Sequence, residues 1–448
     1  MQQFEIDTAY EKKTPSSKRL FDRGTTLFAG GINHNIRYFK PYPFFTERAN
    51  GKFIYDVDSN KYIDYWMGHW ALILGHSAKP LVSALSDQIR KGTLYGTANS
   101  NSVELAGLIQ KLMPRAELIR FCSTGSEATM YAVRLARAKS RKRVVAKVIG
   151  GWHGFNSTLM HSVNYPFHSP EGAGLIAEEG QFVESLPFND LDSSLEILES
   201  VINDLACILL EPILAGAGCI TPDVAYLRGL HEFAKRNNIL LIFDEIVTGF
   251  RLSIGGAAQK YGIEPDIFTL GKIVGGGLPI GVVCGKKDVM TLADPTSNTD
   301  NQIRCNIGGG TFSCNPMTMA AGLSTIKYLD ENSQRVYSKI DRLGTKVRSG
   351  LKKIFRESKI EADVTGEGSL FLTHFLNDKV RTIKNATDAA LSNQHSLHRY
   401  HLALMTLYQI FFLPKKMGAI SFLHTDSDIE RLLIATQAIM ESGIISSK

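Results

Sequence analysis

Residues 239–245 read Ile-Leu-Leu-Ile-Phe-Asp-Glu, and residues 267–272 read Ile-Phe-Thr-Leu-Gly-Lys. Each stretch is a short apolar run that leads into an ionisable side chain, a pattern typical of a buried strand with a functional carboxyl end. Similar apolar runs alternate with helical stretches between about residues 71 and 325, namely at 118–122, 144–149, 206–210 and 280–284. This alternation predicts an α/β fold in which helices cover a mostly parallel sheet.

The length of the chain indicates more than one packed unit. At 448 residues it exceeds the size at which a single hydrophobic core usually stops growing. We expect residues 71–325 to form the large domain and residues 326–448, which open with a long charged helix, to form a smaller α+β domain. Residues 1–70 are rich in turns and predict an N-terminal segment that packs with the small domain.

Composition excludes several classes of protein. The net charge is only +6, and the one dense basic cluster, residues 139–143, stands at the end of a predicted helix, where cations complement the helix dipole. The six cysteines form no CxxC pair, which is typical of a reduced compartment. No apolar run is long enough to cross a bilayer. We therefore expect a cytoplasmic protein with no metal site, no nucleic-acid partner and no membrane segment.

The first candidate site is the turn Ser123-Thr124-Gly125-Ser126, which joins an apolar strand to a helix. The main-chain N–H groups at a helix start, together with the helix dipole, suit a phosphate group. Thr124 and Glu127 have the spacing of a capping box, so an ordinary helix cap is the alternative interpretation.

The second and third candidate sites are Asp244 and Lys272, which stand at the carboxyl ends of two predicted strands. A buried carboxylate suits a cationic partner such as a protonated pyridine nitrogen; the alternative is a helix cap or an ion pair with Arg251. An amine that forms an imine must be desolvated or lie near another cation, and the alternative for Lys272 is a surface lysine before the glycines at 275–277. On the sheet model, both side chains converge on one ring.

Residues 151–154, Gly-Trp-His-Gly, follow another predicted strand. The indole of Trp152 is able to stack on a flat ring, and His153 is adjacent to it. The alternative interpretation of Trp152 is a core aromatic residue at a strand exit.

Taken together and in order, these motifs resemble those of the class III pyridoxal-phosphate aminotransferases of fold type I, most closely the glutamate-1-semialdehyde aminomutase branch. The resemblance extends from about residue 30 to residue 434. It rests on the segments GGINHNIR (30–37), STGSEA (123–128), IFDEIVTGFR (242–251), LGKIVGGGLP (270–279) and GGTFSCNP (309–316).

The resemblance implies a role for each matching residue. Lys272 would hold pyridoxal 5'-phosphate as a Schiff base and move the proton, and Asp244 would keep the pyridine nitrogen protonated, so that the ring acts as an electron sink. The residues implied in binding the cofactor are Ser123, Thr124, Gly125, Ser126, Trp152, His153, Asp244, Ile246, Lys272 and Thr311. Trp152 would cover one ring face and Ile246 the other, while Thr311 would complete the phosphate site of the partner in a homodimer.

The resemblance also implies a substrate site. Arg37 matches an arginine that takes the substrate carboxylate, and Trp70 matches a tryptophan that lines the same pocket. Near the C-terminus, Lys415 and Lys416 stand where the aminomutase pattern carries a glutamate. Either lysine could hold the acid group of an amino donor; the alternative is a solvated charge pair.

This departure makes an aminotransferase the expected activity, with an amino acid as the donor and a small keto or aldehyde acid as the acceptor. The alternative is an intramolecular transfer of the glutamate-1-semialdehyde 2,1-aminomutase type. The segment 155–190 corresponds to a lid that would retain a released intermediate in the aminomutases. A catalytically silent protein on the same fold is a third hypothesis.

Overall fold

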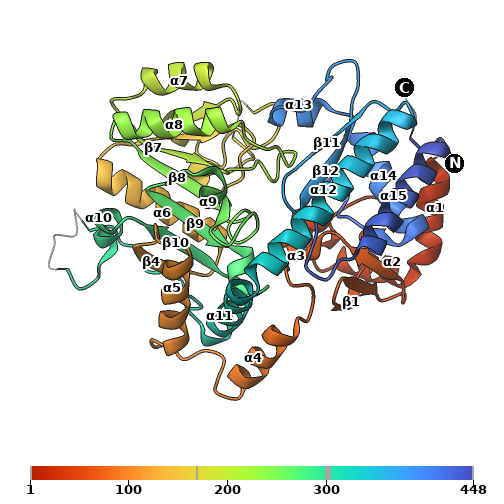
Figure 1. Cartoon of the computed structure of the whole chain (residues 1–448), viewed down its shortest axis with the longest axis horizontal. Coiled ribbons are helices and arrows are strands. Elements are labelled where there is room, and N and C mark those ends of the chain that lie inside the picture. The colour runs from red at the N-terminus through yellow and green to blue at the C-terminus, as the bar shows by residue number, and fades with distance from the viewer. Residues whose placement is uncertain (1–2, 168–169, 298–303, 446–448) are drawn as a thin grey trace. The chain divides into compact units, whose positions relative to one another are not determined.

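A computed structural model describes residues 3–167, 170–297 and 304–445 of the chain (Figure 1). These residues form two compact units. Unit 1 consists of Met1–Ala78, Ser338–Ile383 and Leu391–Lys448, and unit 2 of Lys79–Tyr337 and Lys384–Ala390. Within the described ranges, no helix combines the length and the apolar character that a bilayer crossing requires.

Unit 2 is built on a seven-stranded sheet of order β4-β10-β9-β8-β7-β5-β6. Its strands are β4 (Leu118–Cys122), β5 (Val144–Val148), β6 (Val183–Leu186), β7 (Leu205–Leu210), β8 (Leu240–Glu245), β9 (Ile267–Gly271) and β10 (Gly281–Gly285). The strands β6, β5, β7, β8 and β9 are parallel, whereas β10 is antiparallel to both β9 and β4. The predicted α/β fold with a mostly parallel sheet is confirmed.

Helices accompany this sheet, and Figure 1 shows them around β7, β8, β9 and β10. They are α4 (Lys79–Ile89), α5 (Ser100–Leu112), α6 (Gly125–Ser140), α7 (Leu191–Ser200), α8 (Val224–Arg236), α9 (Gly256–Tyr261), α10 (Lys287–Met290) and α11 (Pro316–Glu331). Two further helices, α12 (Ser333–Glu357) and α13 (Ala386–Leu391), contain residues of both units.

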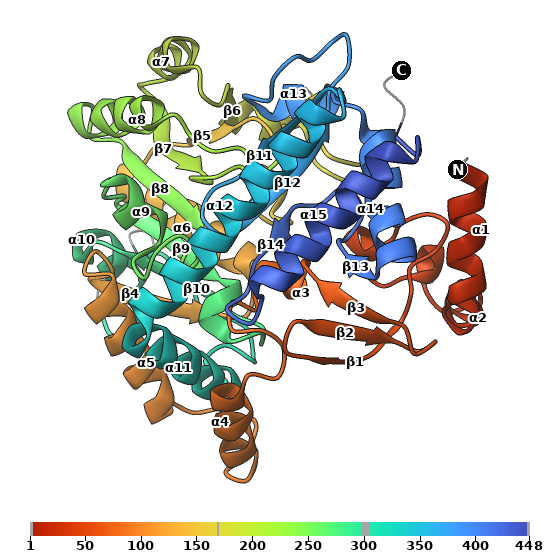
Figure 2. The same cartoon turned by 45° about the vertical axis from the view of Figure 1, so that its right-hand side comes forward.

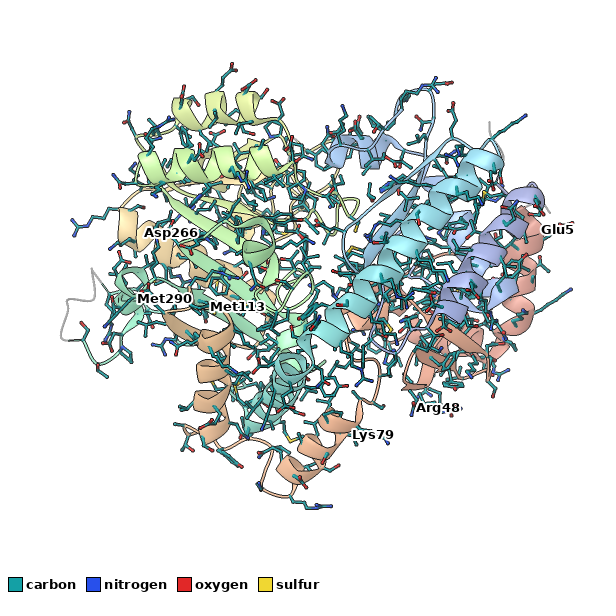
Figure 3. The ribbon with its side chains drawn as sticks, viewed as in Figure 1. Glu5, Arg48, Lys79, Met113, Asp266 and Met290 are labelled. Atoms are coloured by element: carbon teal, nitrogen blue, oxygen red, sulfur yellow. The ribbon has the colours of Figure 1, made fainter. Side chains whose placement is uncertain are left out.

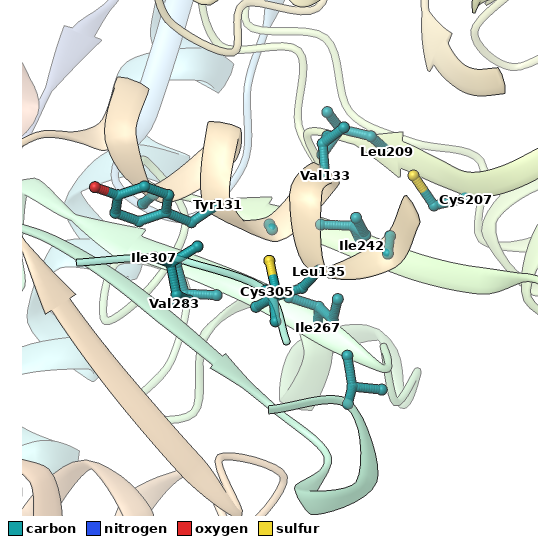
Figure 4. Packing of buried hydrophobic residues seen from close by; sticks show 14 of the residues in the cluster. Tyr131, Val133, Leu135, Cys207, Leu209, Ile242, Ile267, Val283, Cys305 and Ile307 are labelled. Carbon is teal, nitrogen blue, oxygen red and sulfur yellow. The ribbon is translucent and has the colours of Figure 1, made fainter. Parts of the chain in front are cut away.

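The core of unit 2 lies where α6 packs on the sheet (Figure 4). Ala128, Ala132, Leu135 and Ala136 are fully buried, and their spacing of three and four residues places them on one helix face. This face contacts apolar strand residues such as Ile242, Ile267 and Val283. Because small residues dominate the helix face, α6 approaches the strands closely and its first turn is held at the carboxyl edge of the sheet.

Asp266 organises the opposite edge of the same sheet (Figure 3). It directly precedes β9, and its carboxylate accepts the main-chain N–H of Leu241 at 2.8 Å and the amine of Lys286 at 2.6 Å. These contacts tie the amino ends of β8 and β9 to the end of β10. These hydrogen bonds therefore fix the register of the three strands at the end of the sheet opposite to Asp244 and Lys272.

Unit 1 contains two small sheets, of order β1-β2-β3-β13 and β11-β12-β14. Their strands are β1 (Thr46–Asn50), β2 (Phe53–Asp56), β3 (Lys61–Asp64), β11 (Ala362–Thr365), β12 (Leu370–Phe375), β13 (Ile410–Phe411) and β14 (Gly418–Ala419). The helices are α1 (Gln3–Lys13), α2 (Pro15–Gly24), α3 (Met67–Trp70), α14 (Gln394–Tyr408) and α15 (Asp426–Glu441). Ion pairs of Arg342 and Lys346 with Asp426 join α12 to α15, which run side by side in Figure 2.

Candidate active site

The centre of the candidate site is Asp244, near the carboxyl end of β8. Its Oδ2 lies 2.8 Å from His153 Nδ1, while its Oδ1 accepts the hydroxyl of Thr269 and the main-chain N–H of Ile246, each at 3.1 Å. Burial lowers the pKa of His153 by penalising the charged imidazolium, although Asp244 opposes this shift. We infer that the imidazole is neutral and donates its Nδ1–H to Asp244, which fixes the direction of the carboxylate.

Lys272 directly follows β9, the strand next to β8, and is half-buried. Its φ of 49° lies in the left-handed region, which is uncommon for residues other than glycine. Burial lowers the pKa of its amine, and the carboxylates of Asp244 and Glu211 counteract the shift. The neutral amine, which is the nucleophilic form, is therefore more accessible than in an exposed lysine.

The turn 123–126 caps α6 as the capping-box spacing predicts. Thr124 accepts the N–H of Glu127 at 3.1 Å, and Glu127 in return accepts the N–H groups of Thr124 and Ser123 at 2.9 and 2.7 Å. Gly125 and Ser126 are the first two residues of α6, so their N–H groups have no acceptor within the helix. The cap and an anion-binding helix start are thus compatible in this turn.

Two close approaches hold this turn beside the other site residues. A Cβ at Gly154, where φ is 84°, would lie only 2.2 Å from Ser126 Oγ, and Ser126 Oγ also accepts the N–H of Phe155 at 3.2 Å. A Cβ at Gly125 would lie 2.5 Å from Ile246 Cδ1. The side chain of Ile246 also packs against Gly271, because a Cβ at Gly271 would lie 3.3 Å from Ile246 Cδ1. Ile246 therefore lies between the turn 123–126 and Gly271, the residue that precedes Lys272.

Trp152 is not a core residue, because 38% of its surface is exposed to solvent. Its indole makes an edge-to-face contact with Phe155, at a centroid distance of 4.9 Å. The adjacent His153 is fully buried against Asp244, so the two neighbours point in different directions. The indole is available for contact with a ligand, whereas the imidazole acts through the carboxylate.

Two buried charged residues in this region escaped the sequence analysis. Glu211 directly follows β7, and its Oε1 accepts the main-chain N–H of Trp152 at 2.9 Å. Lys147, inside β5, donates to the main-chain oxygen of His161 at 2.6 Å. Burial raises the pKa of Glu211 to about 8, with help from Asp244, and lowers the pKa of Lys147 to about 7. The sequence does contain a signal for Glu211, because this carboxylate directly follows an apolar run, as Asp244 does.

Thr311 is exposed in the loop before α11. Its neighbours in this loop approach the phosphate turn of the same chain, because Ser313 Oγ lies 3.5 Å from Ser123 Oγ and a Cβ at Gly310 would lie 3.5 Å from Glu127 Oε1. The contribution of Thr311 to a partner's phosphate site stays a prediction.

The predicted substrate residues belong to unit 1. Arg37 is exposed at the end of the 3₁₀ turn Asn35–Arg37. Trp70, in contrast, is only 6% exposed and donates its indole N–H to the main-chain oxygen of Met417 at 2.9 Å. Its backbone belongs to a left-handed turn in which Met67, Gly68, His69 and Trp70 all have positive φ. Trp70 is thus a packed residue of this turn, and the side chain of His69 is the more exposed one.

Lys415 and Lys416 differ in their surroundings. Lys415 is exposed and donates its main-chain N–H to Nδ1 of His401 at 3.1 Å. Lys416 is half-buried, and burial together with the charge of Lys415 lowers its pKa. An amine that is partly desolvated binds a carboxylate more strongly than a solvated one does, so Lys416 is the better candidate of the two.

The family model for class III aminotransferases matches residues 37–408. The chain belongs to the class III aminotransferase family. The glutamate-1-semialdehyde 2,1-aminomutase of Archaeoglobus fulgidus is 37% identical over 435 residues, which cover 96% of this chain and 100% of that protein. The aminomutase of Methanothermobacter thermautotrophicus is 36% identical, with 96% of this chain and 99% of that protein covered.

Solved structures agree with this assignment. An omega-transaminase from Sphaerobacter thermophilus has a TM-score of 0.88 at 30% identity and covers 95% of this chain and 97% of its own. A transaminase with pyridoxal phosphate bound has a TM-score of 0.87 at 26% identity, with 96% and 98% covered. The chain is therefore a pyridoxal-phosphate enzyme that acts on small amino or keto acids. This assignment tells against the hypothesis of a silent protein.

The residues of unit 2 fit this cofactor. Asp244 offers a buried, oriented carboxylate to a ring nitrogen, and the first turn of α6 offers N–H groups to a phosphate. Lys272 offers an amine with a lowered pKa on the strand next to Asp244. The apolar side chain of Ile246 lies near Gly125, in the first turn of α6, and near Gly271, which precedes Lys272.

Proposed function

We propose that this enzyme moves the amino group within a small amino-aldehyde acid, as a glutamate-1-semialdehyde 2,1-aminomutase does. The observation that carries the proposal is the buried pair of Asp244 and His153 beside Lys272, in a chain whose similarity to curated aminomutases spans almost its full length. The comparisons thus favour the intramolecular reaction over the transfer between two substrates that the sequence analysis placed first.

Each site residue of unit 2 has a proposed part in this reaction. Lys272 carries the cofactor through its Nζ and moves the proton at the substrate carbon, since its lowered pKa makes the neutral amine accessible. Asp244 binds the protonated ring nitrogen, and His153 holds Asp244 in position for it. Pyridoxal phosphate, when bound, supplies an electron sink for the substrate carbon.

The remaining cofactor residues are proposed to position the ring and the phosphate. Gly125 and Ser126 bind the phosphate through main-chain N–H groups and the Ser126 hydroxyl, with Ser123 and Thr124 shaping the turn. The indole of Trp152 and the side chain of Ile246 cover the two faces of the ring. In a homodimer, Thr311 completes the phosphate site of the partner.

In unit 1, we propose that Arg37 binds the substrate carboxylate, because its guanidinium is exposed and forms paired hydrogen bonds with planar acids. Trp70 is proposed to act indirectly, by holding the left-handed turn that presents His69.

A second candidate function is the transfer of an amino group from a separate donor to an acceptor. The observation that favours it is the pair Lys415 and Lys416, which places cations where the resemblance predicts a carboxylate. A half-buried Lys416 is suited to hold the acid group of an amino donor. The similarity to an omega-transaminase at 30% identity also supports this function.

One experiment separates the two functions. Holoenzyme is incubated with glutamate-1-semialdehyde alone, and the products are followed by NMR. The proposal expects conversion to the isomer that carries the amine on the terminal carbon and a ketone on the carbon beside it, with no amine-free keto acid released. Turnover that requires a separate amino donor, and that releases a keto acid from β- or ω-amino acids in a donor panel, would establish the second function instead.

A further inference from the structure

A row of buried or half-buried ionisable side chains lies at the carboxyl ends of four neighbouring strands. Lys147 belongs to β5, Glu211 directly follows β7, Asp244 belongs to β8 and Lys272 directly follows β9. In the sheet these strands are adjacent in the order β9-β8-β7-β5, and Leu210 pairs with Phe243. The residues after this pair, Glu211 and Asp244, are therefore neighbours at the same edge, with a lysine on the strand to either side.

Glu211 is held rigidly in this row. It is only 4% exposed. Its Oε1 accepts the N–H of Trp152 at 2.9 Å, and its Oε2 accepts the N–H of Ala215 at 3.3 Å. Both donors are main-chain groups of the loops that leave β5 and β7. The carboxylate thus joins two loops at the site, and one of them carries the indole that we assign to the cofactor ring.

The charged groups around Glu211 come from every neighbouring strand. Asp244 from β8 is a like charge, and Lys272 after β9 is an opposite one. The charges of Glu211 and Glu171 raise the pKa of Lys147, in β5, against the effect of burial. The pKa of His153, which follows β5, is raised by Asp244 and lowered by Lys147. Asp244 already accepts hydrogen bonds from His153, Thr269 and Ile246, so its orientation is fixed by other groups. Glu211 is the second carboxylate that acts on Lys272.

We propose that Glu211 is a positioning residue for the amino-transfer reaction, which anchors the main chain of Trp152 and sets the electrostatic environment of Lys272. The inference rests on the proposed role of Lys272 as the residue that carries the cofactor. Burial and the adjacent Asp244 raise the pKa of Glu211 to about 8, so its charge changes near neutral pH. The charge of each of Glu211 and Lys272 favours the charged form of the other.

The test is a pH titration of the near-visible absorbance of the bound cofactor, which requires no turnover. Glu211→Gln keeps an oxygen acceptor for the N–H of Trp152 but removes the charge. Because a carboxylate favours the charged form of a nearby amine, its loss should shift the Lys272-linked transition to lower pH, by about one unit. A broad, coupled transition in the wild type should become a single one-proton step in the variant.

Two further variants separate charge from anchoring. Glu171→Gln removes the charge of a carboxylate that also acts on Lys147 but has no influence on Lys272, and retains an oxygen that accepts the N–H of Val163, so it should leave the transition in place. Glu211→Ala removes both charge and anchor, and should in addition reduce the quenching of Trp152 fluorescence by the cofactor, measured in a background where Trp66 and Trp70 are phenylalanine.

The outcomes are distinct. An unchanged transition in Glu211→Gln, with the wild-type absorbance present, would overturn the role of Glu211. Equal shifts in Glu211→Gln and Glu171→Gln would also overturn it, since the effect would then reflect net charge alone. If the absorbance persists in Lys272→Ala without added amine, the proposed role of Lys272 itself fails, and this result is distinguishable from the other two.

Discussion

His153 Nδ1 lies 2.8 Å from Asp244 Oδ2, and the two side chains are 0% and 3% exposed. The carboxylate is therefore oriented by a neutral imidazole on one oxygen and by Thr269 and Ile246 on the other. A group held in this way loses little entropy when it binds a further partner, which is the property that a ring-nitrogen partner requires.

Asp244→Asn should reduce kcat by roughly three orders of magnitude, about 4 kcal/mol, because an amide does not keep the ring nitrogen protonated. Steady-state kinetics at saturating cofactor measure the change. Asp266→Asn is the matched control, since this carboxylate lies at the opposite edge of the same sheet and should leave kcat within about twofold. A loss below about tenfold in Asp244→Asn, about 1.4 kcal/mol, would remove Asp244 as the ring partner.

His153→Phe should reduce kcat by about 10- to 100-fold, because a buried hydrogen bond to a charged group contributes about 1.5–3 kcal/mol. The double variant with Asp244→Asn should be no slower than Asp244→Asn alone, because His153 acts only through the Asp244 carboxylate. Kinetics of the four enzymes of this cycle provide the measurement. Additive losses would show that His153 acts independently of Asp244.

Gly154→Ala should weaken cofactor binding at least about tenfold and destabilise the fold by more than about 1 kcal/mol. The added Cβ would lie 2.2 Å from Ser126 Oγ on a backbone with φ of 84°, so the first turn of α6 must move. Cofactor titration of the apoenzyme and thermal unfolding measure the two effects. Gly172→Ala is the control, because nothing lies within 4 Å of a Cβ at this position; comparable losses there would refute the explanation.

Arg37→Ala should raise KM for substrates that carry a carboxylate by about 10- to 100-fold and change kcat little, since the guanidinium binds ground state and transition state alike. Amines without an acid group should be unaffected. Arg48→Ala is the matched control in the same unit, because this arginine, labelled in Figure 3, is exposed. Its guanidinium lies over the ring of Tyr55. Equal effects on acidic and neutral amines would contradict a carboxylate contact at Arg37.

Acid should destabilise the protein through His401. Burial lowers the pKa of this imidazole to about 3, and its Nδ1 accepts the N–H of Lys415, which requires the neutral ring. In the unfolded chain the pKa is about 6.5, so the unfolded state binds the proton first and stability falls as the pH drops below that value. At pH 5 the loss is about 2 kcal/mol relative to pH 7.

His401→Asn tests this link, because its amide oxygen is able to accept the N–H of Lys415 and does not titrate. The free energy of unfolding in urea, measured at pH 7 and pH 5, should fall by about 2 kcal/mol less in the variant than in the wild type. An identical fall in both proteins would assign the acid sensitivity to other groups.

Local sequence pattern by itself predicts several parts of unit 2. The strands around Phe243 and Leu270 and the cap at Thr124 follow from apolar runs and residue spacing, and the structure contains them. Local pattern missed Glu211 and Lys147, because their significance depends on which strands are neighbours. That Trp70 lines a substrate pocket stays a prediction; its indole N–H bonds to the main-chain oxygen of Met417, a contact between distant residues that local spacing does not report.

The sequence by itself determined the class of fold and the cofactor, since apolar periodicity specifies which segments are strands and the order of the motifs identifies the family. Only the tertiary structure decided which charges are neighbours. His153 and Asp244 are 91 residues apart in the chain, and their contact follows from the strand order and from burial, which no local spacing reports. The pKa of Lys272 depends on the assembled strands for the same reason, because burial lowers it and the nearby carboxylates of Asp244 and Glu211 oppose that shift.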